Sequence, residues 1–175
     1  MEIPRHILII PDGNRRWAKK KGLAAFLGHG EGAKKLEKIL DVALELKIPY
    51  FTFWGSSLDN ITKRPKEEVD FLFKVFEDNF RKLLENKKIE GEKVRVSALG
   101  RWREFFPDSL KKAMNEVIEK TKDNDLYHLT FLMAYSGVDE MREAIKKIAN
   151  SRAGSKDLEI SESLVKQNLW TKELP

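Results

Sequence analysis

The chain has 175 residues, of which 41% are hydrophobic, and this length suits one compact domain with its own core better than two. It contains no cysteine, which excludes disulfide frameworks, thiolate metal sites and cysteine nucleophiles and fits a cytoplasmic location. The 33 basic and 28 acidic residues give a net charge of +5, which favours an anionic partner without naming one. The first apolar run is too short for a signal peptide or a membrane span, so we expect a soluble protein.

Four short apolar runs, rich in β-branched and aromatic residues, are typical of buried strands. They cover residues 7–10, 50–54, 94–99 and 129–135. Amphipathic stretches with helical spacing cover residues 31–46, 66–86, 108–122, 139–149 and 161–170, and a loop containing residues 153–155 precedes the last of them. This alternation predicts a single α/β domain over residues 1–175, with a mostly parallel central sheet covered by helices on both faces. Ligands of such sheets bind beyond the carboxyl ends of the strands.

The strongest chemical signal follows the first predicted strand, where the sequence reads P-D-G-N-R-R-W. Gly13 permits a close approach of the backbone, and amides that open a helix at Asn14 can point at an anion. Arg15 or Arg16 can grip phosphate oxygens with a bidentate guanidinium. This turn is therefore a candidate diphosphate site.

Asp12 is the unexpected member of this turn, because a carboxylate repels the phosphate that its neighbours attract. A Mg²⁺ ion removes the conflict, since magnesium prefers a few carboxylates together with phosphate oxygens. Asp12 is therefore a candidate Mg²⁺ ligand. The alternative is an aspartate that only caps a helix beside a solvated basic face.

A second segment, residues 28–33, reads G-H-G-E-G-A and precedes the first long predicted helix. We expect a loop that can approach a phosphate closely, in which His29 donates a hydrogen bond to a diphosphate oxygen. The alternative is a partly buried histidine that a backbone carbonyl satisfies.

A third segment, residues 56–65, follows the second predicted strand and should lie at the same sheet edge as Asp12. Asp59 can serve there as an acid or a proton acceptor, Asn60 can orient it, and Arg64 can bind a second phosphate. The alternative makes Asp59 and Asn60 ordinary turn formers and Arg64 an exposed cation.

Taken in order, these motifs resemble those of the cis-prenyltransferases, the undecaprenyl diphosphate synthase family, which elongate farnesyl diphosphate with isopentenyl diphosphate. Residues 6–17 are similar to the family segment H-x-x-I-I-x-D-G-N-x-R-W, and residues 28–32 to G-H-x-x-G. Residues 57–60 are similar to S-x-E-N, with Asp59 in place of the usual glutamate. Near the end, residues 134–137 resemble A-Y-G-G and residues 169–175 resemble L-Y-T-x-x-L-P, so the resemblance covers essentially the whole chain.

The resemblance implies that Asp12 holds a Mg²⁺ cofactor and helps to ionise the allylic diphosphate, with Asp59 and Asn60 as catalytic residues near the condensation centre. Together with the chemistry of the turn, it gives a set of expected substrate-binding residues: Gly13, Asn14, Arg15, Arg16, Trp17, His29, Ser57 and Arg64. The family threads its growing chain between helices and sheet. Candidates to line that tunnel, or simply the core, are Leu36, Ile39, Leu40, Phe71, Phe73, Phe76 and Phe80.

The expected partners are an allylic diphosphate, isopentenyl diphosphate and a second copy in a homodimer, with peripheral membrane contact through the lipid product and no nucleic acid. The chain ends at Pro175, before the family segment D-x-x-I-R-T-G/S-G-E that binds isopentenyl diphosphate, so we expect weak or no condensation from it alone. One alternative is a non-catalytic subunit or scaffold that pairs with a fuller homologue. Another is a phosphatase or nucleotide-binding domain, but no P-loop or G-x-G-x-x-G follows the first strand.

Overall fold

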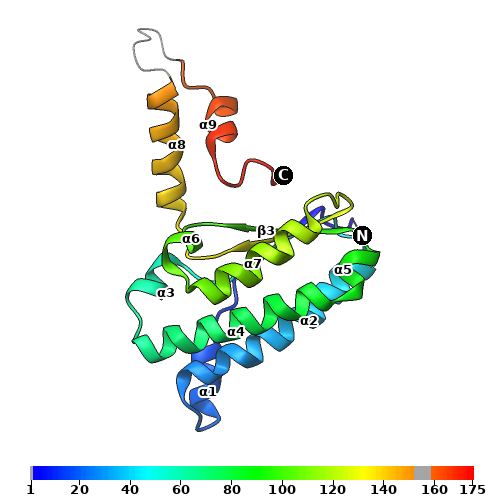
Figure 1. The fold of residues 1–175 in the computed structure, drawn as a ribbon, viewed down its shortest axis with the longest axis vertical. Helices are drawn as coiled ribbons and strands as arrows, with labels where there is room; N and C mark the ends of the chain where they lie inside the picture. Colours follow the sequence, from blue (N-terminus) through cyan, green and yellow to red (C-terminus); the bar gives the residue numbers. More distant parts are fainter. Residues whose placement is uncertain (1, 152–158) are drawn as a thin grey trace.

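The computed structural model describes residues 2–151 and 159–175 of the chain. Its centre is a parallel sheet of four strands in the order β1-β2-β4-β3. The strands are β1 (His6–Ile9), β2 (Tyr50–Trp54), β3 (Val94–Leu99) and β4 (Tyr127–Leu132). Helices lie on both sides of this sheet (Figure 1). The prediction of an α/β fold with a parallel central sheet is therefore confirmed.

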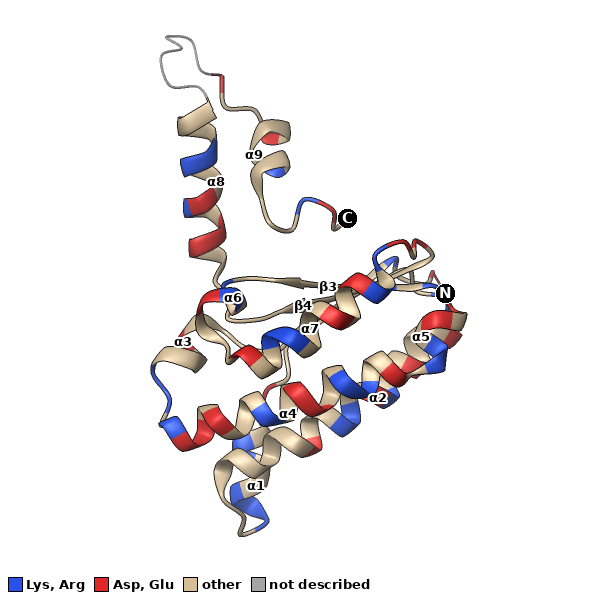
Figure 2. Ribbon diagram, viewed as in Figure 1, with Lys and Arg blue, Asp and Glu red and all other residues tan. Residues whose placement is uncertain are grey.

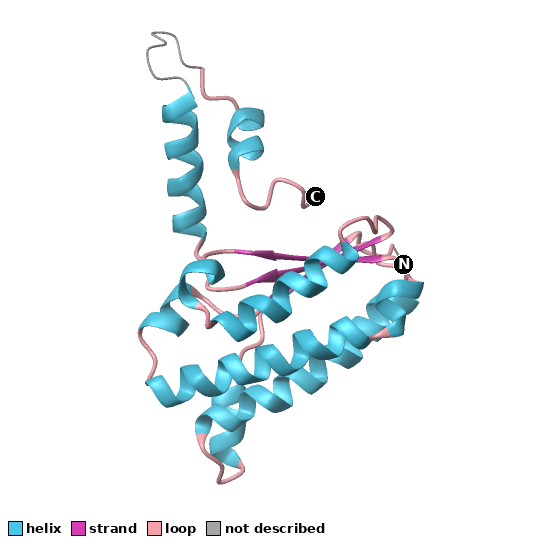
Figure 3. Cartoon of the chain, viewed as in Figure 1, coloured by secondary structure: helices cyan, strands magenta, loops and turns pink. Residues whose placement is uncertain are grey.

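The helices form two groups (Figure 3). Three long helices lie together on one side of the sheet: α2 (Gly28–Glu45), α4 (Lys66–Glu85) and α7 (Asp108–Thr121). On the other side, α8 (Gly137–Ser151) and α9 (Glu162–Asn168) run side by side and project away from the sheet. The short helical segments are α1 (Asn14–Lys20), η1 (Ala25–Leu27), α3 (Leu58–Thr62), α5 (Lys87–Gly91) and α6 (Trp102–Phe105). Among the described residues, no helix combines the length and the apolar character that a membrane crossing requires.

The core lies between the sheet and the three long helices. Strand side chains alternate between the two faces of a sheet, so neighbours in register form rows. Phe51 of β2 is in register with Leu129 of β4, and both are buried. Phe76 and Phe80 sit one turn apart on α4, and the Phe80 ring centroid lies 4.9 Å from that of Phe131. Removing one such aromatic side chain from a core costs about 3–5 kcal/mol.

The observed boundaries differ from the predicted ones where tertiary contacts take over. β4 begins two residues earlier than predicted, because His128 donates its N–H to the carbonyl of Pro49 at 2.8 Å and stacks on Tyr50. It ends three residues earlier, and Ala134 beyond it has a φ of 48°, which extended backbone does not allow. The predicted loop at residues 153–155 lies outside the described residues.

The predicted loop at residues 28–33 is helical, because α2 starts at Gly28. Its glycines serve a close contact with the start of α1. A Cβ atom at Gly28 would lie 2.0 Å from the backbone oxygen of Asn14, and one at Gly32 would lie 2.7 Å from Asn14 Nδ2. The glycines therefore let α2 pack directly against Asn14. The prediction of a loop at this motif is wrong, since residues 28–33 are helical, and the close approach that the structure shows is between two helices.

We expect Gly28→Ala to destabilise the protein by about 1–3 kcal/mol, because the new methyl group overlaps the backbone of Asn14. Gly30→Ala is the matched control, because a Cβ there meets nothing within 4 Å. The control should be neutral or stabilising by up to about 1 kcal/mol, since alanine favours helices. Urea unfolding of the two variants measures the difference, and equal stabilities would contradict the packing role of Gly28.

Candidate substrate-binding site

Parallel strands bring the segments that follow β1 and β2 to the same edge of the sheet. Residues 10–14 follow β1 there, and residues 55–64 follow β2. The first half of α2 and the part of α4 from Leu72 to Leu83 close the space beside these segments. The turn predicted to bind a diphosphate and the segment containing Asn60 therefore meet, as expected for strands that run in the same direction.

An apolar cavity of about 380 Å³ lies between the sheet, α2 and α4. Its walls include Leu36 from α2, Phe76 and Phe80 from α4, and Phe131 from β4. A smaller cavity of about 230 Å³ adjoins it toward α5, and the two share Leu36 and Phe131. We call the first the main cavity and the second the rear cavity.

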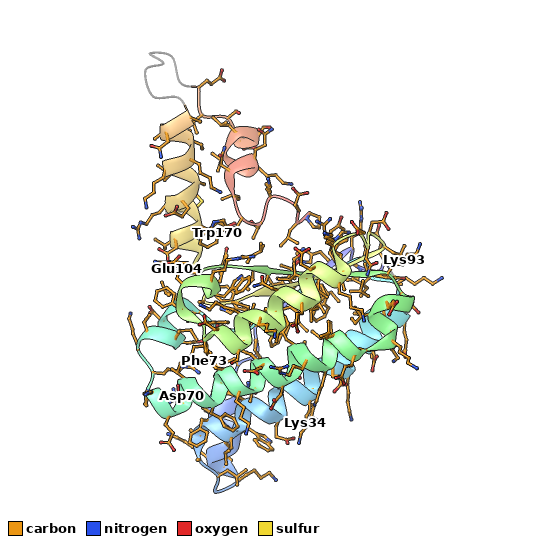
Figure 4. All side chains as sticks on the ribbon, viewed as in Figure 1. Lys34, Asp70, Phe73, Lys93, Glu104 and Trp170 are labelled. Carbon is orange, nitrogen blue, oxygen red and sulfur yellow. The ribbon has the colours of Figure 1, made fainter. Side chains whose placement is uncertain are left out.

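Three of the seven tunnel candidates line neither of these two cavities. Phe71 packs on Phe26 with 5.1 Å between ring centroids, and Phe73 packs on Phe106 at 5.0 Å (Figure 4). Ile39 is 40% exposed. The other four do line a cavity: Leu36, Phe76 and Phe80 the main one, and Leu36 and Leu40 the rear one.

A polar cavity of about 450 Å³ adjoins the main cavity, and we call it the mouth. It is lined by Pro11, Asp12, Gly13, Asn14, Arg15, Arg16, Lys19, His29 and Arg64. Four of these, Pro11, Asn14, His29 and Arg64, also line the main cavity. A cationic mouth thus opens directly onto an apolar cavity.

The turn between β1 and α1 takes its shape from Gly13, whose φ of 91° is a conformation that favours glycine. Asp12 accepts the Gly13 N–H at 2.5 Å and a guanidinium N–H of Arg16 at 2.8 Å. These two hydrogen bonds lower the pKa of Asp12, so its exposed carboxylate is ionised at neutral pH.

The described residues hold no group of three or more His, Cys, Asp or Glu side chains that would form a metal cage of protein atoms. Asp12 therefore supplies a single carboxylate at the mouth. Mg²⁺ commonly binds through one or two carboxylates and completes its shell with substrate phosphates and water. The chemistry of Asp12 fits such an ion when a diphosphate is bound.

Glu68 on α4 is the central charged group of the site, and the sequence interpretation missed it. Its side chain is 6% exposed, and its Oε1 accepts a hydrogen bond from Arg64 Nη1 at 2.9 Å. The same oxygen lies 3.2 Å from His29 Nε2 and 3.6 Å from Arg15 Nε. A buried carboxylate needs such partners, and here they come from three different elements. The spacing of Arg64 and Glu68, four residues apart at a helix start, is the signal that could have revealed it.

His29 lines both the main cavity and the mouth, and its ring is mostly buried. Burial lowers the pKa of His29, while its hydrogen bond to Glu68 acts in the opposite direction. The imidazole is therefore neutral near pH 7 and can donate one N–H.

The segment after β2 divides into residues that face the main cavity and one that does not. Ser57 and Asn60 line the cavity and form a capping box at the start of α3, in which Ser57 Oγ accepts the Asn60 N–H at 3.0 Å. Asp59 instead pairs with Lys63 at 2.8 Å, is 67% exposed and lines neither the main cavity nor the mouth. The structure therefore brings Asn60, but not Asp59, to the site.

Trp17 also lies apart from the site, since it is 41% exposed and lines neither the main cavity nor the mouth. Trp17 lies on the exposed side of α1, whereas the adjacent Ala18 is fully buried. The adjacent Arg16 reaches the mouth, although its side chain is 75% exposed.

We expect Glu68→Gln to lower the pKa of His29 further, because the carboxylate that favours the imidazolium is lost while Arg64 and Arg15 remain. We also expect a loss of about 2 kcal/mol in stability, since hydrogen bonds to a charged group weaken. NMR titration of the His29 ring and urea unfolding measure the two effects. Glu67→Gln, an exposed neighbour on the same helix, is the control and should change neither. An unchanged His29 pKa in Glu68→Gln would show that the carboxylate does not tune this ring.

Comparison with known proteins agrees with this geometry. The prenyltransferase family model for undecaprenyl diphosphate synthase matches residues 10–175. A tritrans,polycis-undecaprenyl-diphosphate synthase (geranylgeranyl-diphosphate specific) from Pyrococcus horikoshii is 40% identical over 99% of this chain, and an isoprenyl transferase from Thermotoga maritima is 39% identical over 100% of it. The crystal structure of lavandulyl diphosphate synthase from Lavandula x intermedia in complex with dimethylallyl diphosphate superposes with a TM-score of 0.87 and 31% identity, over 96% of this chain and 71% of that one.

The chain therefore belongs to the undecaprenyl diphosphate synthase family of cis-prenyltransferases. It spans 66% of the length of the Pyrococcus relative and 73% of the Thermotoga relative.

Proposed function

We propose that this site binds an allylic isoprenoid diphosphate, with the diphosphate in the mouth and the prenyl chain in the main cavity. The substrate would then condense with isopentenyl diphosphate to extend a Z-polyprenyl diphosphate. The observation that carries the proposal is the shared wall of the two cavities, where His29 and Arg64 stand between cationic and apolar surroundings. Such an arrangement matches an amphiphile with an anionic head and an apolar tail.

The mouth suits the head group. Arg15, Arg16, Lys19 and Arg64 place four cations around it, and guanidinium groups bind phosphate oxygens in a bidentate manner. Asp12 is the one acidic residue that lines it. Its negative charge supports a Mg²⁺-bound diphosphate over the free anion.

The main cavity suits the prenyl chain. Its volume of about 380 Å³ lies within the usual range for small-molecule sites, and most of its wall is apolar. Burying a hydrocarbon contributes about 0.8 kcal/mol per CH₂ group, so several isoprene carbons would dominate the affinity. The rear cavity offers room for a longer chain toward α5.

Two relatives support an allylic substrate. The lavandulyl diphosphate synthase that this fold resembles was crystallised with dimethylallyl diphosphate, and the Pyrococcus relative is named for geranylgeranyl diphosphate. We therefore propose a primer of farnesyl type, with geranylgeranyl diphosphate as the longer candidate.

The residues of this chain have separable tasks in the proposed reaction. Arg64, positioned by its contacts with Glu68 and His29, holds the diphosphate while the allylic carbon–oxygen bond ionises. Donors placed at the departing oxygens stabilise their growing charge. When bound at Asp12, Mg²⁺ would neutralise part of that charge. The apolar wall formed by Leu36 and Phe76 excludes water that would otherwise capture the allylic cation. Asn60 lines this space while its Oδ1 accepts the Ser57 N–H. Asp59 is exposed outside the cavities, and we assign it no step in the reaction.

A second candidate function is a non-catalytic subunit that keeps the allylic site. The observation that favours it is the position of Asp59, an expected catalytic residue that pairs with Lys63 and lines neither the main cavity nor the mouth. Incubation with farnesyl diphosphate and radiolabelled isopentenyl diphosphate separates the two. Polyprenyl product identifies a catalytic chain, and farnesyl diphosphate binding without product identifies the subunit.

We expect Val75→Trp to weaken farnesyl diphosphate binding at least about tenfold, because the indole fills space that the prenyl chain requires. Binding of inorganic diphosphate should be unchanged, since the mouth is not altered. Lys74→Trp is the matched control, because Lys74 is an exposed neighbour on the same helix. Isothermal titration calorimetry measures all four affinities. Equal farnesyl diphosphate affinity in both variants would refute the placement of the chain.

We expect Asp12→Asn to abolish the gain in farnesyl diphosphate affinity that Mg²⁺ gives the unmodified protein, because the amide is a far weaker ligand for a hard cation. Affinity without Mg²⁺ should stay the same or rise, since one negative charge at the mouth is removed. Asp59→Asn removes an equal charge outside the cavities and should leave the Mg²⁺ effect intact. Calorimetry with and without Mg²⁺ checks both variants, and a full Mg²⁺ effect in Asp12→Asn would exclude Asp12 as the ligand.

A further inference from the structure

The positive charge of the chain is concentrated in one segment. Residues 13–30 contain five basic residues and no acidic one, whereas the rest of the chain has 28 of each sign. The whole net charge of +5 therefore originates in this segment. It folds into α1, a turn, η1 and the first residues of α2. We call residues 13–27, which hold all five basic residues, the basic lobe.

The basic lobe lies at one end of the long axis of the molecule, far from α8 and α9 (Figures 1 and 2). It is firmly attached, because Ala18 is fully buried and the Phe26 ring packs on Phe71 of α4 at 5.1 Å. These contacts hold the exposed side chains of the lobe in fixed positions relative to the rest of the molecule.

The cations of the lobe fall into two groups. Arg16 pairs with Asp12, and Arg15 lies near Glu68, so these two belong to the mouth. Lys19, Lys20 and Lys21 are exposed, and none of the three forms an ion pair with a residue that the structure describes. Most other surface lysines have an acidic residue three or four positions away, as Lys34 has Glu31.

Large apolar side chains stand exposed among these lysines. Trp17 is 41% exposed, Leu23 45% and Leu27 39%. An ordinary solvated basic surface does not need such residues. Lysines together with exposed tryptophan and leucine are instead the composition of segments that rest in the interface of an anionic bilayer.

We propose that the basic lobe docks on an anionic lipid surface, with Lys20 and Lys21 facing the head groups and Leu23 entering the interface. Each lysine near such a surface contributes about fivefold to binding, and the apolar side chains add to this. Lys19 lines the mouth, so docking would hold the mouth beside the bilayer. That consequence rests on the proposed function, because only a prenyl substrate or product gains from a nearby membrane, whereas docking itself requires no substrate.

Nucleic acid is the competing polyanion, and the exposed leucines argue against it. Phosphate backbones attract lysines through charge alone, and single strands stack on aromatic rings, but neither uses exposed aliphatic side chains. The lobe offers Leu23 and Leu27 beside its single tryptophan.

Vesicle co-sedimentation of the full chain without substrate tests the proposal. The probes are phosphatidylcholine vesicles with and without phosphatidylglycerol. We expect binding only to the anionic vesicles, weakened by salt, and weakened at least about tenfold in Lys20→Glu/Lys21→Glu. Lys87→Glu/Lys93→Glu is the matched control, because it makes the same change in charge at two exposed lysines. Lys87 lies on α5, and Lys93 directly precedes β3 (Figure 4). This control should bind nearly as well as the unmodified protein.

Leu23→Ser tests the apolar part of the surface. We expect its binding to anionic vesicles to fall about threefold or more at every salt concentration. Leu126→Ser is its control and should have no effect, because Leu126 is 54% exposed and lies outside the basic lobe. Thermal unfolding confirms that each variant is folded, and farnesyl diphosphate calorimetry on the same samples tests the proposed function separately. Equal binding to both vesicle types, equal losses in the test and control variants, or lobe-dependent binding to RNA without vesicle binding would each overturn the proposal.

Discussion

One buried carboxylate ties together the parts of the molecule that form the site. Glu68 lies on α4, yet its partners Arg64, His29 and Arg15 come from the loop before α4, from α2 and from α1. A buried negative charge is tolerated only with such partners, so folding must bring the three elements to the same point. The same contacts hold one imidazole and two guanidinium groups at the mouth. One group thus supports the packing of three elements and positions the cations of the mouth.

The packing of α2 against α1 is the second constraint on the site. It holds together Asn14 and His29, which line both the mouth and the main cavity. Gly28 and Gly32 allow Asn14 to contact α2 directly, so the turn after β1 cannot move away from His29. A motif that resembles a phosphate-binding loop therefore acts through helix packing. Of residues 28–33, His29 alone lines the mouth, and the glycines beside it serve the contact with Asn14.

The basic residues of α1 and the turn after it divide between the mouth and the exposed surface of the basic lobe. Arg15 and Arg16 have acidic partners and line the mouth together with Lys19, whereas Lys20 and Lys21 are exposed on the basic lobe. A single basic stretch of sequence thus serves two surfaces, because successive residues of a helix point in different directions. The family relationship concerns the first surface, and the lipid-docking proposal concerns the second.

The sequence by itself determined the strands, the long helices and the family. β2 and β3 match their predicted limits, since short apolar β-branched runs have few alternatives. The ordered motifs also located the turn at Asp12 and the segment of Asn60 at one sheet edge, because parallel strands leave no other arrangement. These features depend on residues that are close together in the sequence, so a local sequence pattern can predict them.

Only the tertiary structure decided which side chains share the site. Asp59 and Asn60 are adjacent in sequence, but the helical start of α3 turns Asn60 inward and leaves Asp59 with Lys63. Glu68 is one of many acidic residues on an amphipathic helix, and only its burial against residues from distant segments distinguishes it. Contacts between segments tens of residues apart are a property of the whole packed chain, so no local pattern could specify them.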